Sequence, residues 1–386
     1  MKTLQSLWLT SVLVVLACTE KKEAPKPAPV EPPKPAVVAK PPPAVEPRVD
    51  KECAAPIDPG PTTDITIAGR AAKLSGARLT FADKDADGTL TLGVVGPLNE
   101  DSGENMVNVK KYVKYFQEQK VDAILVTGDV GETAPGIARA LKEFAASKLP
   151  VFAVIGNREC RADFTDGVNA ANAETQGAVI NLNQVRVVEF PELMLVTLPG
   201  YHNPEYMGCA TGCVYLKSTV EEVIREAKAA TIPVALVSHG PPQGKGTQAL
   251  DSATNNGGNV GDPVVGKAIA DGHIGFGFFS NIKEAGGRAT TDVAGETLLK
   301  EKTPSKTLFL NPGPADSFGW AMNDGTTAVG MVAVFKFKDG QASWEQFRAK
   351  PLTSGEKATA KTLAPPAAPK AEGTPAPTPA PVPTLP

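Results

Sequence analysis

Apolar residues in the central part of the chain follow two alternating patterns. Continuous apolar runs, such as 123–127 and 150–155, are typical of strands that are covered on both faces. Between such runs, apolar residues recur at helical spacing. We therefore expect helices at 105–119, 135–148, 218–230 and 262–271, and strands at 89–95, 123–127, 150–155, 186–190, 193–198, 233–238, 275–279, 307–310, 328–337 and 342–347. A βαβαβ beginning followed by mainly β elements predicts an α/β protein in which two sheets pack together with helices outside.

An acidic segment, 83–88, precedes the strand that starts at Thr89. Its Asp-Lys-Asp-Ala-Asp-Gly sequence resembles half of an EF-hand loop, but the twelfth position of that loop is Val94, which has no carboxylate. We therefore expect a hairpin turn between a strand at 79–81 and the strand at 89–95.

The N-terminal residues have the features of a signal peptide, predicted at 1–17. One positive charge at Lys2 is followed by an apolar stretch that ends at Cys18. Residues 15–18, Val-Leu-Ala-Cys, resemble a bacterial lipobox. That resemblance implies cleavage before Cys18, lipid attachment to it and anchoring in the membrane of the bacterial envelope. Thr19, which is not aspartate, implies an outer-membrane lipoprotein that faces the periplasm or the cell surface. A plain secreted signal peptide is the alternative.

Two further segments have compositions that cannot bury a core. Residues 18–50 are rich in Pro, Ala, Lys and Val and predict an extended linker. Residues 351–386 end in Pro-Ala and Pro-Thr repeats and predict a disordered tail. The sequence thus predicts one large domain at 89–350, preceded by a lead-in at 51–88.

Four cysteines follow Cys18. An even number in an exported protein suggests disulfides, with three possible pairings. A bridge between Cys209 and Cys213 would close a small loop and leave Cys53 with Cys160. No second CxxC motif or cluster of histidines favours a cysteine metal site. The formal net charge of −3 and the lack of a basic stripe argue against nucleic acid as a partner.

Compact polar residues follow three of the predicted strands. Asp129 comes after Gly128, Asn157 after Gly156, and His239 after Ser238. In α/β sheets, ligands bind beyond the carboxyl ends of the strands. These side chains are therefore candidates for one binding site, although each of them could instead bond the amides of its own turn.

In this order the motifs resemble those of the calcineurin-like metallophosphoesterase family over about residues 89–335. The matching pieces are Gly-Asp at 128–129, Gly-Asn at 156–157, Ser-His at 238–239 and an Asn-Pro-Gly turn at 311–313. The resemblance implies a four-layer α/β/β/α sandwich of two mixed sheets, with a two-metal centre at the strand ends.

The chain departs from the family pattern at several of its ligand positions. Gly96 and Leu98 stand where the family has Asp and His, and Asn281 and Lys283 stand where it has two histidines. Arg158 stands at the position of the histidine that assists protonation of the leaving group.

The resemblance therefore implies a degenerate centre. Such a centre would bind one divalent metal (Mn, Fe or Zn) or none. The residues that would bind the metal are Asp129, Asn157, His239 and Asn281. Lysine has no lone pair while it is charged. We therefore expect Lys283 to replace the other metal with a tethered positive charge beside Asp129, and Arg158 to add a second one. Both are candidates for anion binding.

Other polar residues near these motifs are weaker candidates for the missing ligands. Three lie just beyond the first motif, namely Asn99, Glu100 and Asp101. Four others are more typical of turn or supporting residues, namely His202, His273, Glu159 and Glu284.

The sequence leaves three functions open. A degenerate site favours a binding or scaffold module that recognises a phosphate-bearing ligand or an envelope protein. A one-metal phosphoesterase that hydrolyses phosphate mono- or diesters is the enzymatic alternative. The third is a structural envelope tether with long Pro-rich arms.

Overall fold

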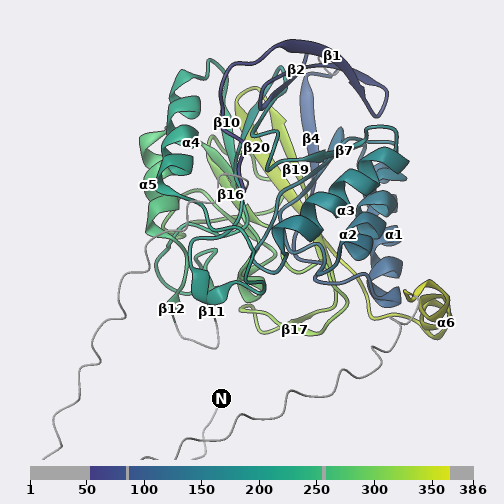
Figure 1. Cartoon of the computed structure of the whole chain (residues 1–386). Helices are drawn as coiled ribbons and strands as arrows, with labels where there is room; N and C mark the ends of the chain where they lie inside the picture. The colour runs from purple at the N-terminus through teal and green to yellow at the C-terminus, as the bar shows by residue number, and fades with distance from the viewer. Residues whose placement is uncertain (1–52, 84–86, 254–257, 366–386) are drawn as a thin grey trace, which may run out of the picture. The chain divides into compact units, whose positions relative to one another are not determined.

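Two large mixed β-sheets form the framework of the protein (Figure 1). The computed structural model describes residues 53–83, 87–253 and 258–365. The predicted signal peptide, Cys18, the Pro-rich linker and the tail from 366 onward lie outside the described residues. In the described part, no helix is both long and apolar enough to cross a membrane.

The first sheet has six strands in the order β20-β19-β4-β5-β6-β7. Their bounds are β4 (Thr89–Val95), β5 (Ala123–Val126), β6 (Val151–Ala153), β7 (Val179–Asn181), β19 (Met331–Lys338) and β20 (Gln341–Arg348). Strands β4 to β7 are parallel, whereas β19 is antiparallel to both β4 and β20.

The second sheet has ten strands in the order β1-β2-β3-β8-β9-β10-β13-β16-β14-β15. Their bounds are β1 (Thr62–Ile67), β2 (Arg70–Ser75), β3 (Arg78–Phe81), β8 (Val187–Glu189), β9 (Met194–Leu198), β10 (Val234–Ser238), β13 (Phe276–Phe278), β14 (Arg288–Thr290), β15 (Leu298–Leu299) and β16 (Leu308–Asn311). Strands β9, β10, β13 and β16 are parallel to one another. Two short pairs stand apart from the sheets: β11 (Ser252–Ala253) with β12 (Gly258–Asn259), and β17 (Trp320–Ala321) with β18 (Thr327–Ala328).

The helices lie on both sides of this framework (Figure 1). Their bounds are α1 (Gly103–Glu118), α2 (Ala134–Ala145), α3 (Arg161–Glu174), α4 (Lys217–Ala229), α5 (Pro263–Asp271) and α6 (Ser354–Leu363), with short 3₁₀ helices η1 (Pro204–Tyr206) and η2 (Lys283–Ala285). Helices α1 to α3 share a buried apolar cluster with the six-stranded sheet. Helices α4 and α5 share another with the ten-stranded sheet. A third cluster contains apolar side chains of both sheets.

This arrangement brings the carboxyl ends of parallel strands from both sheets to a common region. Each predicted site residue follows one such strand, since Asp129 comes after β5, Asn157 after β6, His239 after β10 and Asn281 after β13. The predicted helices and strands between 89 and 350 are present, with ends that differ by a few residues.

The predicted hairpin at 83–88 is wrong. Strand β3 belongs to the ten-stranded sheet and β4 to the six-stranded sheet, so the chain passes from one sheet to the other. The reason is that Leu79 and Phe81 face the same inter-sheet core as Leu90 and Leu92. A hairpin would have placed all four in one sheet. The predicted lead-in likewise supplies β1, β2 and β3 to the larger sheet.

The predicted disorder of the tail is wrong for 354–363, which form helix α6. The Glu356 carboxylate accepts from Thr353 N at 2.8 Å, and Thr353 Oγ1 accepts from Glu356 N at 3.3 Å. Lys111 of α1 forms an ion pair with Glu356 at 3.0 Å. The reciprocal capping pattern Thr-x-x-Glu is visible in the sequence and predicts this helix.

Helix α4 begins at Lys217, one residue before the predicted start at 218. Leu216 is the N-cap residue, and its backbone N–H donates to Thr219 Oγ1 at 3.4 Å.

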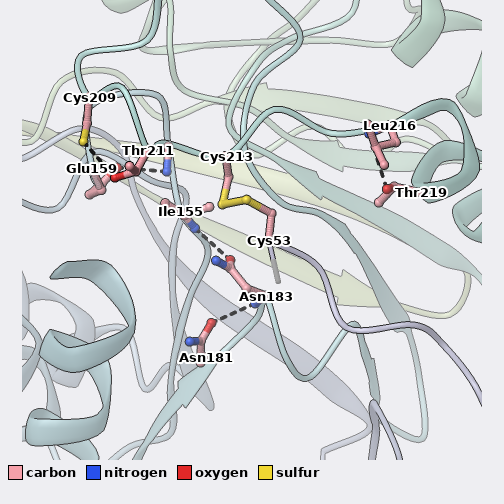
Figure 2. Close-up of a disulfide and its surroundings, with 11 residues drawn as sticks. Cys53, Ile155, Glu159, Asn181, Asn183, Cys209, Thr211, Cys213, Leu216 and Thr219 are labelled. Atoms are coloured by element: carbon pink, nitrogen blue, oxygen red, sulfur yellow. Dashed lines mark hydrogen bonds between the residues drawn. A yellow bond between two sulfur atoms is a disulfide. The ribbon is translucent and has the colours of Figure 1, made fainter. Parts of the chain in front are cut away.

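The disulfides join Cys53 to Cys213 and Cys160 to Cys209. Figure 2 shows Cys53 and Cys213 bonded, with Cys209 directed elsewhere. The pairing first considered, Cys209 with Cys213, is therefore wrong. Cys213 is buried, and its carbonyl accepts from Tyr201 N at 2.9 Å, whereas Cys209 faces the start of α3. Both bridges hold the loop between β9 and α4.

Removing either disulfide should destabilise the protein by about 2–4 kcal/mol, because a cross-link restricts the unfolded chain. The closed loops span 160 and 49 residues, so the loop-closure difference is about 1 kcal/mol. We expect Cys53→Ser/Cys213→Ser to lose more stability than Cys160→Ser/Cys209→Ser. Urea unfolding of both double variants measures this. An unchanged free energy of unfolding in either one would contradict the assigned pairing.

Candidate metal and anion site

Side chains from three other strand ends converge on the imidazole of His239. Its Nε2 atom lies 2.9 Å from Asn157 Oδ1, 3.2 Å from Asn281 Oδ1 and 3.4 Å from Asp129 Oδ1. His239 and Asp129 are almost completely buried. The structure thus brings together all four residues that the sequence predicted as metal ligands.

The hydrogen bonds around His239 direct its Nε2 atom toward these oxygens. Nδ1 lies 2.8 Å from the carbonyl oxygen of Thr127, which can only accept, so Nδ1 carries the hydrogen and donates it. Nε2 then faces the other three side chains. The Asn157 amide nitrogen donates to Tyr206 O at 2.5 Å, which turns its Oδ1 toward His239.

Asp129 carries the negative charge of the site. Its Oδ1 accepts from the backbone N–H groups of Asn157 and Arg158, both at 3.1 Å. Burial raises its pKa, but the neighbouring His239, Lys283 and backbone amide outweigh burial and hold the pKa of Asp129 well below its usual range. Burial conversely lowers the pKa of His239, and Asp129 overcomes that effect, so the pKa of His239 is raised.

The donors lie close enough together to be ligands of one divalent metal ion. Tetrahedral zinc lies about 2.0–2.2 Å from nitrogen and oxygen ligands, which separates neighbouring ligands by roughly 3.3–3.6 Å. The three oxygens lie 2.9–3.4 Å from His239 Nε2. Among the described residues, no group of three or more His, Cys, Asp or Glu side chains could hold a metal. The fit therefore depends on two neutral amide oxygens, one from Asn157 and one from Asn281.

A second metal does not fit beside the first. A Cβ atom on Gly96 would lie 2.1 Å from the carbonyl oxygen of Gly313, so no ligand side chain has room there. Leu98 is fully buried in the cluster with helices α1 to α3. Lys283 Nζ instead lies 3.7 Å from Asp129 Oδ2. A lysine ammonium repels a metal cation and has no lone pair for it.

The pairing of Lys283 with Asp129, which the sequence predicted, is part of a closed ring of contacts in which Trp320 and Asp316 were not predicted. The ammonium of Lys283 lies 5.3 Å from the ring centroid of Trp320, whose indole Nε1 donates to Asp316 Oδ1 at 2.7 Å. The amide of Asn99 donates to the other oxygen of Asp316. The backbone N–H of Asn99 donates to the carbonyl of Asp129 at 2.7 Å, which completes the ring. No local motif marks Trp320 or Asp316, because they are remote in sequence from the other members.

The guanidinium of Arg158 pairs with Glu132 and not with Asp129, so the expectation of a second charge paired with Asp129 is wrong. Only the backbone N–H of Arg158 reaches Asp129. Burial lowers the pKa of Arg158, but the Glu132 contacts outweigh burial and raise it. Arg158 therefore stays charged and lies at the edge of the site.

The structure gives none of the following candidates a place beside the four predicted metal ligands. Asp101 forms an ion pair with Arg139 at 3.0 Å, and Glu100 is exposed. The ring of His202 packs at a tilt against that of Tyr201, with ring centroids 4.4 Å apart. His273 has a φ of 53° in the turn after α5. Glu284 lies in η2, beside Lys283.

Glu159 is completely buried and joins two of the ligand loops. Its carboxylate accepts from Val130 N at 2.5 Å and from Gly156 N at 3.0 Å. Burial and the charge of Asp129 raise the pKa of Glu159 to about 7. Glu159 thus supports the turns that present Asp129 and Asn157.

Glu159→Ala should destabilise the protein by about 2–5 kcal/mol, because it leaves two buried backbone donors without acceptors. Glu159→Gln keeps one acceptor and should lose less. Denaturant unfolding of the two variants measures the difference. Equal stability of Glu159→Ala and the parent protein would contradict this supporting role.

Comparison with known proteins shows distant structural similarity only. No protein-family model matches the chain, and no curated protein matches it. Similar solved structures include TT1561 of Thermus thermophilus, with 11% identity, a TM-score of 0.46 and coverage of 67% of this chain and 99% of that chain. A dimetal phosphatase from Danio rerio has 13% identity, a TM-score of 0.42 and coverage of 67% and 96%. A purple acid phosphatase from yellow lupin seeds has 10% identity, a TM-score of 0.37 and coverage of 78% and 62%. All three TM-scores are below 0.5, so none of these similarities assigns the chain to a family.

Proposed function

We propose that this domain is a degenerate calcineurin-like metallophosphoesterase that binds a phosphate group and does not carry out two-metal hydrolysis. The observation that supports this most directly is the ammonium of Lys283, 3.7 Å from Asp129 Oδ2. This ammonium places a fixed positive charge beside Asp129. In the family that the motifs resemble, the carboxylate at this position bridges two metals.

The family assignment within this proposal rests on the chain's own motifs. Asp129, Asn157 and His239 follow parallel strands in the order that the family pattern requires, and their side chains meet. The three apolar clusters are the ones expected of a four-layer α/β/β/α sandwich.

The same residues favour binding over hydrolysis. Two-metal hydrolysis uses paired cations to orient and activate water and to neutralise the phosphoryl oxygens. Lys283 can donate hydrogen bonds to a phosphoryl oxygen, but it cannot coordinate water as a metal does. Arg158 cannot act as a general acid, because a guanidinium keeps its proton. The chain therefore retains groups that recognise an anion and lacks those that complete the reaction.

A divalent ion (Mn, Fe or Zn) at the four-ligand site would supply Lewis-acid attraction for a phosphoryl oxygen. Asp129, Asn157, His239 and Asn281 would hold it. Thr127 keeps His239 in the tautomer that offers Nε2. Without a metal, the charges of Lys283 and Arg158 are the ones proposed to attract the anion.

Lys283→Gln should weaken binding of inorganic phosphate by roughly ten- to hundredfold, since a charged hydrogen bond contributes about 1.5–3 kcal/mol. Lys283→Arg keeps the charge and should retain most of the affinity, and Lys73→Gln on exposed β2 is the matched control. Isothermal titration calorimetry with and without Mn²⁺ measures this. Unchanged affinity in Lys283→Gln, or no binding to the parent protein, would refute the proposed phosphate site.

The alternative function is a one-metal phosphoesterase, which the fit of four donors to a single ion favours. We expect no metal-dependent turnover of p-nitrophenyl phosphate or of its bis ester with added Mn²⁺. Turnover that disappears in both Asp129→Asn and His239→Gln would establish the enzyme and overturn the binding-only proposal. Metal analysis of the same variants measures whether these residues hold the ion.

We further propose that Cys18 anchors the protein to the outer membrane of a bacterial envelope, where the domain acts as a binding or scaffold module. The lipobox-like sequence at 15–18 supports this. The parent protein should take up labelled fatty acid and fractionate with membranes, whereas Cys18→Ser should do neither. If both proteins fractionate alike, the anchor is not at Cys18. Capture of envelope proteins that depends on 19–50 but not on Lys283 would favour the structural tether instead.

A further inference from the structure

Two exposed aromatic side chains belong to the loops that contact the candidate site. The exposed large hydrophobic residues of the described part are Tyr206, Val264, Leu298 and Phe318. The carbonyl of Tyr206 holds the amide of Asn157. Phe318, which is 64% exposed, packs against Trp320 with ring centroids 5.1 Å apart. Trp320 is in turn the ring that faces Lys283.

A cavity of about 860 Å³ lies at this aromatic pair. Its wall includes Phe318, Trp320, Asn99 and Arg158, and Lys357 and Lys361 of α6 lie on it as well. This volume is within the range of small-molecule sites, roughly 300–1,000 Å³. Because Trp320 lies on the wall and also faces Lys283, the cavity is next to the proposed phosphate site.

The aromatic side of the cavity is held in place by buried polar contacts. The indole N–H of Trp320 donates to Asp316. The loop that contains Ser317 is held by Asn105, whose Oδ1 accepts from Ser317 N at 2.6 Å and from Ser317 Oγ at 2.8 Å. Phe318 lies between these anchored residues and is nevertheless exposed. A rigid loop that holds an aromatic ring in solvent beside a cavity is typical of a stacking surface for a ligand.

We propose that this cavity is a second subsite, which binds a planar aromatic group carried by the phosphate-bearing ligand. The inference rests on the proposed phosphate site at Lys283. The aromatic group stacks on Phe318 and contacts Trp320, whose ring is inclined to that of Phe318 by 65°, while its phosphate faces Lys283. The preferred ligands are therefore aryl phosphates rather than alkyl phosphates.

The test compares phenyl phosphate, ethyl phosphate and inorganic phosphate by calorimetry on the full chain. The two esters share a charged group and differ in the aromatic ring. We expect phenyl phosphate to bind roughly tenfold more tightly than ethyl phosphate. Phe318→Ala should abolish that preference and leave inorganic phosphate unchanged. Leu298→Ala, an exposed apolar residue on β15, is the matched control and should preserve the preference.

The outcomes separate the two proposals. If inorganic phosphate binds but the two esters bind equally, the aromatic subsite is refuted and the phosphate site stands. If the preference survives in Phe318→Ala, stacking on Phe318 is refuted. If inorganic phosphate does not bind the parent protein, the phosphate site is refuted, and the subsite defined through it is refuted as well.

Discussion

The buried carboxylate of Asp129 is the group on which the rest of the site depends. A charge removed from water is costly unless it is paired and hydrogen-bonded. Asp129 receives two backbone N–H groups on Oδ1, the imidazole of His239 and the ammonium of Lys283. Oδ2 has no hydrogen bond within the described part of the chain, and the ammonium of Lys283 lies 3.7 Å from it. A change at position 283 is therefore expected to alter the balance of charge at the buried carboxylate, as well as the proposed anion binding.

Close backbone packing around this carboxylate limits which side chains fit at the neighbouring glycine positions. A Cβ on Gly156 would lie 2.3 Å from Asp129 Oδ1, and one on Gly128 would lie 2.5 Å from His239 Nδ1. Gly128 also has a φ of 99°. These glycines allow the ligand loops to approach one another. Gly96 is packed in the same way against Gly313, so a single substitution there would not restore the missing ligand.

Two loops surround the four ligands and connect the site to more distant structure. The loop between β9 and α4 is held by both disulfides and positions the amide of Asn157. The loop at 316–320 positions Trp320 against Lys283. One loop is therefore fixed by covalent bonds and the other by hydrogen bonds. Each carries an exposed aromatic ring, and that of Phe318 lies on the cavity proposed as the aromatic subsite.

The sequence by itself determined the elements with strong local patterns. Apolar runs and helical repeats marked the central strands and helices, and the order of Asp129, Asn157 and His239 at strand ends indicated one site. Helix α3 was missed because its apolar residues are few and it contains Gly167. The sheet to which β3 belongs, the cysteine pairing and the contact of Lys283 with Trp320 were decided only by tertiary structure. The physical reason is that local patterns report which face of a segment is buried, whereas these features depend on which remote segment covers it.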